Sequence, residues 1–406
     1  MTVSANAPNE REFFLDWLRI LAFGVLVIYH VGMYYVSWDW HIKSPAAGAA
    51  IEPWMRLFAP WRMDLIFLVS GAATSMMLRR RADGRGLPAE RARRLLPPLL
   101  LGVFVVVPPQ SYFEVVQRFR FDAGYGEFML RYLTGYNGFC AAPGHCLILP
   151  TWNHLWYLPY LLCYTLVLWG LVCWRPGLPE RLAQRLIALP GRGWLLVGPF
   201  VFLLLTRALL REHFPVTRAL VDDWFMHAQY FGVFFLGVVL ARAPRAWQQL
   251  ADARWSALLI ALAAWALLTA ATGRVLPAGA PIVAALSSFD GPLLRSMLVS
   301  AQQWGAIVAA LGFGWRHLRR DGPARRYLTD AVFPVYVLHQ TVIIVLAVWL
   351  APLALAAPIE AVLLSAATLA VCLAGFEIVR RVDWLRPWFG LKRLDPQPAA
   401  QRVAAW

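Results

Sequence analysis

Three ionisable side chains lie in one apolar stretch near the start of the chain. The stretch reads LDWLRILAFGVLVIYH, residues 15 to 30, and it contains Asp16, Arg19 and His30. On an α-helix these three side chains share one face, and Arg19 and His30 are separated by roughly 16 Å along the axis. An ionisable group at the centre of a membrane helix costs at least about 2.5 kcal/mol unless it meets a partner or water. The stripe therefore predicts a polar cavity beside this helix.

His30 is the residue that we expect to act as a general base. An imidazole takes up and returns a proton near neutral pH, and such a base can activate an alcohol for attack on an acyl carbon. Arg62, in APWRMDLIFLVSG, falls at a similar predicted depth and can stabilise the resulting oxyanion, as can Arg19. Proton-coupled transport would use the same residues, so acyl transfer and transport both remain open at this point.

Other apolar segments also carry ionisable groups at their outer half or centre. These are Glu114 in PPQSYFE, His154 in NHLWYL and His339 in VYVLHQ. We expect Glu114 and His154 to bind the acceptor or to orient His30, and we assign His339 and Asp16 to substrate binding. The simpler alternative for each is a local contact, such as an ion pair of Asp16 with the arginine three residues on. Together the groups predict one shared chamber that is open from both sides of the membrane.

An arginine-rich stretch separates the second and third apolar segments. It reads LRRRADGRGLPAERARRLLPP, with seven arginines and no lysine. Arginine's planar fork suits bidentate contact with phosphate, so we expect Arg91, Arg94 and Arg80 to bind the phosphates of coenzyme A. The alternative is an orientation signal in contact with anionic lipid. The sequence has no P-loop, HExxH, paired CxxC or GxSxG pattern, so we expect no metal and neither a nucleotide hydrolase nor an esterase elbow.

The elements that must position these residues are membrane helices. The chain is 60% hydrophobic and 15% charged, with a mean hydropathy of +0.54, whereas a soluble domain is about 25% charged. We predict an all-α polytopic protein with a single domain over residues 1–395 and a short cytoplasmic tail over 396–406. Segments long enough to cross a bilayer lie at 15–36, 57–78, 95–116, 154–174, 194–210, 225–241, 255–272, 296–315, 332–351 and 359–379.

Prolines interrupt the third of these ten segments near both ends. Pro97 and Pro98 lie near its start, and Pro108 and Pro109 lie towards its end. Membranes tolerate such breaks where other protein groups or water satisfy the freed backbone. We therefore expect kinks or unwinding in this segment.

The distribution of basic residues predicts the orientation. The net charge is +15, but only 9 lysines and arginines lie in the odd-numbered loops, against 26 in the even-numbered loops and the two termini. Basic residues collect on the cytoplasmic side, so both termini are predicted to be cytoplasmic. Because the basic charge reports topology and no nucleic-acid-binding motif accompanies it, we do not expect a nucleic acid partner.

Two cysteines share one loop that this topology places outside. Cys140 and Cys146 lie between the third and fourth segments, in a compartment where disulfides persist. A small disulfide loop and two free thiols both remain possible from the sequence.

The motifs taken together resemble the acyltransferase 3 family of integral membrane acyltransferases. The resemblance rests on Arg19 and His30 with ten residues between them, on the arginine ahead of FLVSG, and on Arg91 and Arg94. Further stretches, among them REFFLDWLR, NHLWYL and FEIVRRVDWLRPWFGLK, look most like the glucan-modifying branch of that family. The resemblance covers residues 10 to 395, while the middle helices from about 194 to 310 match by hydropathy alone.

The resemblance implies a ten-helix enzyme of a bacterial inner membrane. It would move an acyl group, succinyl or acetyl, from cytoplasmic acyl-CoA to a hydroxyl of an extracytoplasmic glycan, with membrane lipid as its surroundings. The family's helix-one arginine and histidine fall on Arg19 and His30, and its paired arginines fall on Arg91 and Arg94. The rival interpretations are a transporter or flippase for an acylated glycan or lipid, and a non-enzymatic membrane scaffold.

Overall fold

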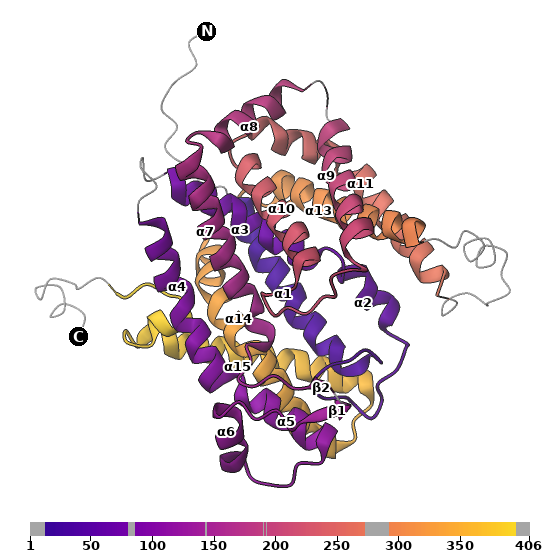
Figure 1. The fold of residues 1–406 in the computed structure, drawn as a ribbon, viewed down its shortest axis with the longest axis vertical. Coiled ribbons are helices and arrows are strands. Elements are labelled where there is room, and N and C mark those ends of the chain that lie inside the picture. The colour runs from indigo at the N-terminus through magenta and orange to yellow at the C-terminus, as the bar shows by residue number, and fades with distance from the viewer. Residues whose placement is uncertain are drawn as a thin grey trace, which may run out of the picture.

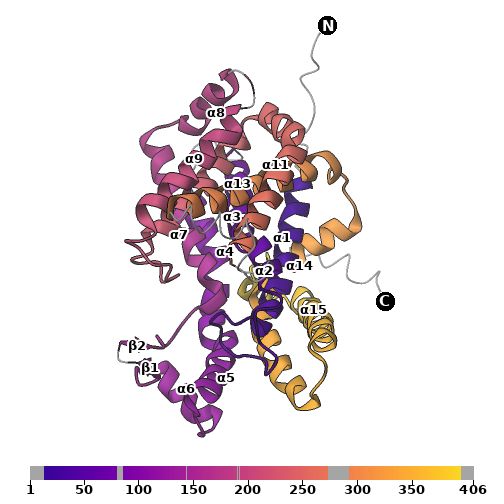
Figure 2. The same ribbon diagram turned by 90° about the vertical axis from the view of Figure 1, so that its right-hand side faces the viewer.

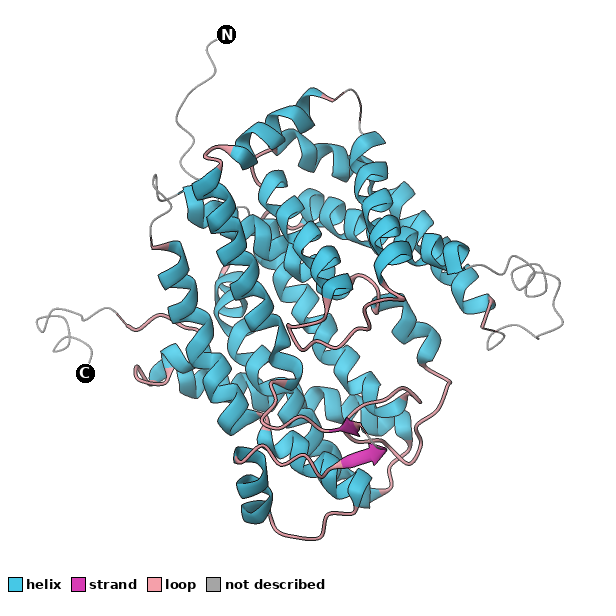
Figure 3. Ribbon diagram, in the orientation of Figure 1, coloured by secondary structure: helices cyan, strands magenta, loops and turns pink. Residues whose placement is uncertain are grey.

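The protein folds as a bundle of helices with one short β-hairpin (Figures 1 and 3). The computed structural model describes residues 13–79, 86–142, 144–189, 191, 193–272 and 292–394. Helices dominate these residues, which confirms the all-α prediction. The two short strands, β1 (Cys140–Ala142) and β2 (His145–Cys146), form the hairpin.

Each of the ten predicted segments overlaps a helix. The long helices are α1 (Phe13–Tyr35), α3 (Arg62–Arg79), α4 (Leu87–Leu101), α5 (Pro108–Phe119), α7 (Tyr157–Trp174), α9 (Gly193–Leu210), α10 (Trp224–Leu240), α11 (Pro244–Ala270), α13 (Pro292–His317), α14 (Pro323–Leu350) and α15 (Ala357–Arg381). The third predicted segment corresponds to α4 and α5 joined by η1 (Gly102–Val106), which is a π-helix.

Shorter elements lie between the long helices and, in the case of η4, after the last of them; the sequence did not indicate them. They are α2 (Glu52–Phe58), α6 (Tyr125–Leu133), α8 (Leu178–Ala188) and the 3₁₀ turns η2 (Asn153–Trp156), η3 (Ala351–Leu353) and η4 (Arg386–Phe389). Figures 1 and 2 agree in placing α8 at the opposite end of the molecule from α6 and the hairpin.

Eight helical stretches of the described residues are long and apolar enough to cross a membrane. The two predicted spans that fall short are α10, which has 17 residues, and α3, which carries Arg62, Asp64 and Arg79. These two helices pack on each other inside the bundle. A Cβ on Gly71 would lie 1.9 Å from the Phe234 carbonyl oxygen, so α3 and α10 touch backbone to backbone. Because α3 is mostly buried in protein, it needs less apolar surface than a helix that faces lipid.

Neighbouring helices run in the directions that the predicted topology requires. The first and ninth predicted spans, α1 and α14, are parallel, because Arg19 bonds the Thr329 carbonyl near their starts and His30 bonds His339 further along both. The consecutive spans α11 and α13 are antiparallel, since Gly305 packs on Ala261 while Gly312 packs on Leu250. An odd number of crossings therefore lies between α1 and α14, and the predicted topology has seven there.

The proline-rich third segment stays helical but changes its winding. The Val107 N–H donates to the Gly102 carbonyl oxygen at 2.8 Å, which is π-helical spacing. Pro108 has no N–H to continue this pattern, and the Val103 carbonyl accepts a hydrogen bond of 2.8 Å from the Tyr132 hydroxyl. The Val106 carbonyl accepts one of 2.6 Å from Thr341. Side chains of neighbouring elements thus replace the backbone donors that proline removes.

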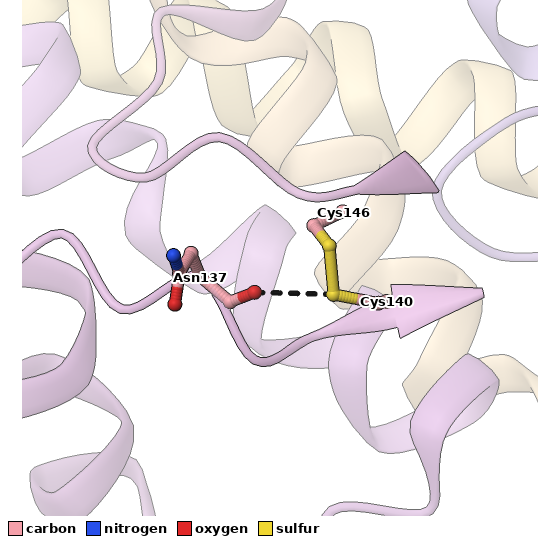
Figure 4. Close-up of a disulfide and its surroundings, with 3 residues drawn as sticks. All are labelled: Asn137, Cys140 and Cys146. Atoms are coloured by element: carbon pink, nitrogen blue, oxygen red, sulfur yellow. Dashed lines mark hydrogen bonds between the residues drawn. A yellow bond between two sulfur atoms is a disulfide. The ribbon is translucent and has the colours of Figure 1, made fainter. Parts of the chain in front are cut away.

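The hairpin contains a disulfide between Cys140 and Cys146, which are paired residues of β1 and β2 (Figure 4). The Cys140 Sγ also lies 3.1 Å from the carbonyl oxygen of Asn137. Of the two states that the sequence left open, the structure shows the disulfide. It agrees with the prediction that this loop faces an oxidising compartment.

Candidate active site

A large polar cavity lies beside His30. Its volume is about 1050 Å³, and its wall includes His30 from α1, Arg62 from α3 and His154 from η2. Parts of three connections complete the wall, at residues 38–41, 151–153 and 216–218. These connections are odd-numbered loops in the predicted topology, so the cavity lies on the side predicted to face away from the cytoplasm. We call it the polar cavity.

The position of His30 is fixed by a second histidine on the parallel helix α14. The His30 Nδ1 lies 2.7 Å from the Nε2 of His339, and the two rings are stacked with centroids 5.0 Å apart. The Nδ1 of His339 lies 2.7 Å from the Tyr336 carbonyl oxygen, which can only accept, so this nitrogen carries a hydrogen. In the neutral pair, Nε2 of His339 is then the acceptor and Nδ1 of His30 is the donor. The Nε2 of His30 therefore bears a free lone pair.

This arrangement gives His339 a role different from the one predicted. We expected it to bind substrate, but it is fully buried and hydrogen-bonded to His30, so it holds the ring of His30 in place. Orientation of a catalytic histidine through its other ring nitrogen is how histidine bases are commonly held in one tautomer.

Arg62 lies at the wall of the polar cavity with His30, as predicted. Its guanidinium carbon is 3.5 Å from the centre of the Tyr29 ring, and its Nη1 donates to the Ala59 carbonyl at 2.9 Å. Neither contact neutralises the charge, because an aromatic face and a carbonyl are both uncharged. Arg62 is therefore held in place while its positive charge stays available to a developing oxyanion.

His154 also lines the polar cavity, and a chain of side chains links it to Glu114. The Gln110 amide nitrogen lies 3.3 Å from the Nδ1 of His154, and its amide oxygen accepts a hydrogen bond of 2.9 Å from Gln340. The Gln340 amide nitrogen lies 2.9 Å from the Nε2 of His41, whose Nδ1 donates to the carboxylate of Glu114. His41 and Gln340 both line the cavity.

Glu114 therefore does not contact His30. Its carboxylate bonds His41 and lies 3.4 Å from Arg118. We predicted that it would bind the acceptor or orient the base, and the structure instead places it behind His41. The carboxylate fixes the tautomer of His41, so that the Nε2 of His41 is an acceptor at the cavity wall.

Asp16 and Arg19 lie at the opposite end of α1 from the polar cavity. Asp16 forms an ion pair with Arg325, and the Arg19 Nη2 donates to the Thr329 carbonyl at 3.1 Å. Both contacts join the start of α1 to α14. The assignment of Asp16 to substrate binding has no support from this position, since it is not part of the cavity wall.

Arg19 belongs to a second group of charges, which we call the arginine cluster and define as Arg19, Arg91 and Arg94. Electrostatic interactions connect all three. Arg91 is buried and donates to the hydroxyl of Thr74, whereas Arg94 is exposed. The structure thus brings together two of the three arginines that we expected to bind the donor phosphates, Arg91 and Arg94. Arg19, which we expected to stabilise the oxyanion beside His30, lies with them and is not part of the cavity wall. Arg80, the third expected phosphate ligand, lies outside the described residues.

An aromatic partition of Phe23, Tyr157 and Tyr336 lies between the arginine cluster and the polar cavity. Phe23 is four residues after Arg19 on the same face of α1, and its ring centre is 5.2 Å from that of Tyr336 and 6.4 Å from that of Tyr157. All three rings are buried. The wall of the polar cavity includes Tyr336 but none of the cluster arginines. In the described residues, the polar cavity therefore does not extend to the arginine cluster, unlike the single chamber that we predicted.

The sequence interpretation missed several residues of this site. His41 was overlooked because it lies in a loop, and Gln110 and Gln340 because a neutral amide in an apolar segment is a weak signal. Arg207, which also lines the cavity, gave the same signal as Arg62, namely an arginine inside an apolar segment. Among the described residues, no group of three or more histidine, cysteine or acidic side chains is arranged to hold a metal ion.

Comparison with known proteins identifies the family of the chain. The acyltransferase 3 family, described as an acyltransferase domain, matches residues 12–377. Similar proteins include the glucans biosynthesis protein C of Salmonella gallinarum, 26% identical over 180 residues, and that of Salmonella typhi, 25% identical over 183 residues. The first match covers 43% of each protein, and the second covers 42% of this chain and 41% of its relative.

The chain therefore spans less than half the length of the curated relatives that it matches. No solved structure matches it. The family match, by contrast, covers most of the chain and includes α1 with His30, α3 with Arg62 and α14 with His339. With its many apolar helices, the chain is a multi-pass membrane protein, and it belongs to the acyltransferase 3 family of acyltransferases.

Proposed function

We propose that the protein is a membrane-bound O-acyltransferase. It takes a succinyl or acetyl group from cytoplasmic acyl-CoA and delivers it to a hydroxyl of an extracytoplasmic glycan, such as a periplasmic glucan, at a bacterial inner membrane. The observation that carries the proposal is that His30, whose Nε2 is left free by its bond to His339, and Arg62 line the same polar cavity.

The reaction follows from these positions. Nε2 of His30 takes the proton of an acceptor hydroxyl as the hydroxyl oxygen attacks the thioester carbonyl carbon. Arg62 stabilises the negative charge that develops on the carbonyl oxygen. When the carbon–sulfur bond breaks, the proton on His30 passes to the departing coenzyme A thiolate. The products are an ester and a free thiol, and His30 returns to its starting state.

The donor approaches from the arginine cluster in this proposal. Arg94 is exposed and can bind phosphate, and the Nε of Arg91 has no hydrogen-bond partner in the described structure. The rise from Arg19 to His30 is roughly 16 Å, a distance that an extended pantetheine arm can span. Because the aromatic partition lies on this route, the thioester reaches His30 only when Phe23, Tyr157 and Tyr336 move apart.

The glycan acceptor is supported by two observations. The polar cavity is open to the side predicted to be extracytoplasmic, and its polar wall suits a molecule rich in hydroxyl groups. The similar Salmonella proteins carry a name that refers to glucan biosynthesis. We therefore choose a glucan hydroxyl as the first acceptor to test.

The test is thiol release by the full chain in lipid nanodiscs. Acetyl-CoA and succinyl-CoA are supplied in turn, with and without a glucan, and wild type is compared with His30→Ala and with His145→Ala. His145 lies in the exposed hairpin, so its substitution removes a histidine without touching the cavity. We expect release that depends on the glucan, that is lost in His30→Ala and that is unchanged in His145→Ala.

Two outcomes would contradict the proposal. Equal thiol release by His30→Ala and wild type would remove His30 from the mechanism. No release with any donor, combined with movement of a glycan across the membrane of a proteoliposome, would favour a transporter or flippase.

A further inference from the structure

The wall of the polar cavity carries much more positive charge than the proposed chemistry requires. Six arginines line it, against two aspartates, Asp39 and Asp64. The arginines are Arg56, Arg62, Arg207, Arg211, Arg218 and Arg295. Asp39 forms an ion pair with Arg118, which lies outside the cavity wall. Of the two aspartates, only Asp64 therefore remains to balance the positive charge of the wall in the described structure.

Most of these arginines form no ion pair in the described structure, although Asp64 interacts electrostatically with Arg62 and Arg207. Arg56 lies 3.5 Å from Glu52, so its charge is compensated. Among the residues that the structure describes, no carboxylate forms an ion pair with Arg207, Arg211 or Arg295. Positive charge gathered at a concave site attracts anions and raises their local concentration.

Arg207 is held in a fixed position in the cavity wall, as a binding residue would be. It lies near the end of α9, and its side chain is 8% exposed. Its Nη2 donates to the amide oxygen of Gln303 at 2.7 Å and to that of Gln229 at 3.3 Å, while its Nε has no hydrogen-bond partner. A buried guanidinium fixed by two neutral amides keeps both its full charge and an unused donor.

The surroundings of Arg207 separate this group from the base. Its electrostatic interactions are with Arg211, Asp64 and Arg295, whereas those of His30 are with His339, Arg62, His154 and Arg218. Arg207, Arg211 and Arg295 lie at the end of α9 and the start of α13. His30 and most of its partners come from α1, α3, η2 and α14, and only Arg218 comes from the connection after α9. The two groups thus occupy largely different parts of one cavity wall.

We propose that Arg207, Arg211 and Arg295 form an anion subsite that binds a carboxylate or phosphate group carried by the acceptor. The inference deepens the proposed acyl transfer by naming the acceptor's chemistry, and it rests on that function. The acceptor, not the donor, brings the anion, because the acceptor enters from the side where these arginines lie, whereas the donor arrives from the arginine cluster. A molecule held by its anionic group at the subsite would present a hydroxyl to His30 elsewhere in the same cavity.

Binding is tested first, without any donor. Sn-glycerol 1-phosphate, succinate and uncharged glycerol are titrated into the full chain in nanodiscs at constant ionic strength. We expect the two anions to bind and glycerol not to bind, and we expect Arg207→Gln and Arg295→Gln each to weaken anion binding by about 10-fold or more. The more strongly bound anion identifies the preferred group.

Controls separate loss of the site from loss of the fold. Arg295 is exposed, so Arg295→Gln removes charge without disturbing a buried contact. Arg131 pairs with Glu127 on α6, outside the cavity wall, so Arg131→Gln is the matched control for the lost charge and should bind the anions as wild type does. Anion binding that is equal in wild type and both subsite variants would overturn the proposal.

Kinetics then identify which substrate carries the anion. Acetyl-CoA, whose acyl group is uncharged, is used with a neutral glucan and with the same glucan after phosphorylation. We expect wild type to have the lower KM for the phosphorylated glucan, and Arg207→Gln to lose most of this preference. A change in Arg207→Gln that appears only when succinyl-CoA replaces acetyl-CoA would assign the subsite to the acyl group and overturn the proposal.

The two failures are distinguishable. If no acyl transfer occurs but the anions bind through Arg207 and Arg295, the proposed function fails and the subsite stands. If transfer to a glucan depends on His30 but the anions do not bind, the function stands and the subsite fails.

Discussion

The arginine cluster and the polar cavity use the same residue type in opposite ways. In the cluster, Arg91 is engaged by Thr74 and Arg19 by a backbone carbonyl of α14, so these side chains also join α1, α3, α4 and α14. In the cavity, Arg62 and Arg207 are fixed by uncharged groups and line an open volume. The difference teaches that arginine at membrane depth can be a structural tie or a binding group. Its partners decide which it is.

The histidine pair is a second difference between the polar cavity and the arginine cluster. His30 and His339 face each other across two parallel helices at the cavity wall, with their ring nitrogens 2.7 Å apart. In our proposal the polar cavity is the reaction centre and the cluster is the entry site for the donor. Three experiments test this division, and a fourth tests how the cavity end of α1 is held.

The largest effect is expected at the histidine pair. General-base catalysis contributes about 10²–10⁴-fold in rate, so His30→Ala should lower kcat by that factor. His339→Phe should lower it by less, because it removes the acceptor that orients Nδ1 of His30 but leaves the base. The double variant should be no slower than His30→Ala alone, since residues that act as a unit are not additive.

The measurement is kcat for acyl transfer in the wild type, the two single variants and the double variant. His145→Ala supplies the reference for loss of an unrelated histidine. Effects that multiply in the double variant would show that His339 acts independently of His30, and the tautomer argument would then be wrong.

The second-largest effect is expected at the aromatic partition. Phe23→Leu replaces one ring of the partition with a smaller side chain that is still apolar. We expect thiol release without acceptor to rise by up to about tenfold, which is about 1.4 kcal/mol of barrier, because water in the cavity then reaches the thioester. The rate is measured with acetyl-CoA alone.

Phe128→Leu is the matched control for this change. Phe128 is fully buried in the separate apolar cluster of α5 and α6, away from the partition. If both leucine variants release thiol at the same raised rate, the effect reflects general loosening and the partition has no special role. An unchanged rate in Phe23→Leu would place the donor route elsewhere.

The arginine cluster should affect donor binding more than chemistry. Loss of a charge-assisted hydrogen bond costs about 1.5–3 kcal/mol, so Arg94→Gln should raise KM for acetyl-CoA by about 10- to 100-fold with little change in kcat. The rise should disappear with 3′-dephospho-acetyl-CoA if Arg94 binds the 3′-phosphate. Arg93→Gln removes an exposed neighbour and is the control. A large fall in kcat instead would move Arg94 into the reaction centre.

The sequence anticipated the charged residues of both regions better than the contacts between them. His30 and Arg62 were found because an ionisable side chain is conspicuous in an apolar segment. The pairing of His30 with His339 was not found, because it depends on how α1 and α14 pack across 309 residues of chain. The partition was missed because Phe23 and Tyr336 look like ordinary core residues until the space on either side is known.

The helices show the same limit. Their ten approximate positions followed from hydropathy, whereas α3 and α10 depart from the pattern because they bury each other. The close approach at Gly71 depends on both α3 and α10, and the sequence of either helix alone does not reveal it. Local pattern therefore predicts which residues enter the membrane, and packing decides which of them meet.

The smallest expected effect concerns Lys43, in the loop that follows α1 at the cavity end. Its Nζ donates to the carbonyls of Met33 at 2.7 Å and Val36 at 2.8 Å, and so caps the end of α1. Burial lowers the pKa of Lys43 to about 8, below the value of about 10.4 in an unfolded chain. Between these values the unfolded chain binds more protons, so this lysine's contribution to stability should rise with pH.

The measurement is the thermal unfolding of wild type and Lys43→Met in nanodiscs between pH 7.5 and 10. We expect the stability of wild type relative to Lys43→Met to increase over this range, by less than about 1 kcal/mol because solvent screens a half-exposed group. Lys392→Met, which changes the chain's other lysine at an exposed position, is the control and should show no such trend. A wild-type advantage that shrinks as pH rises would mean that the ammonium gains more from the two carbonyls than it loses by burial. The end of α1 would then be held by charge, as the arginine cluster holds its start.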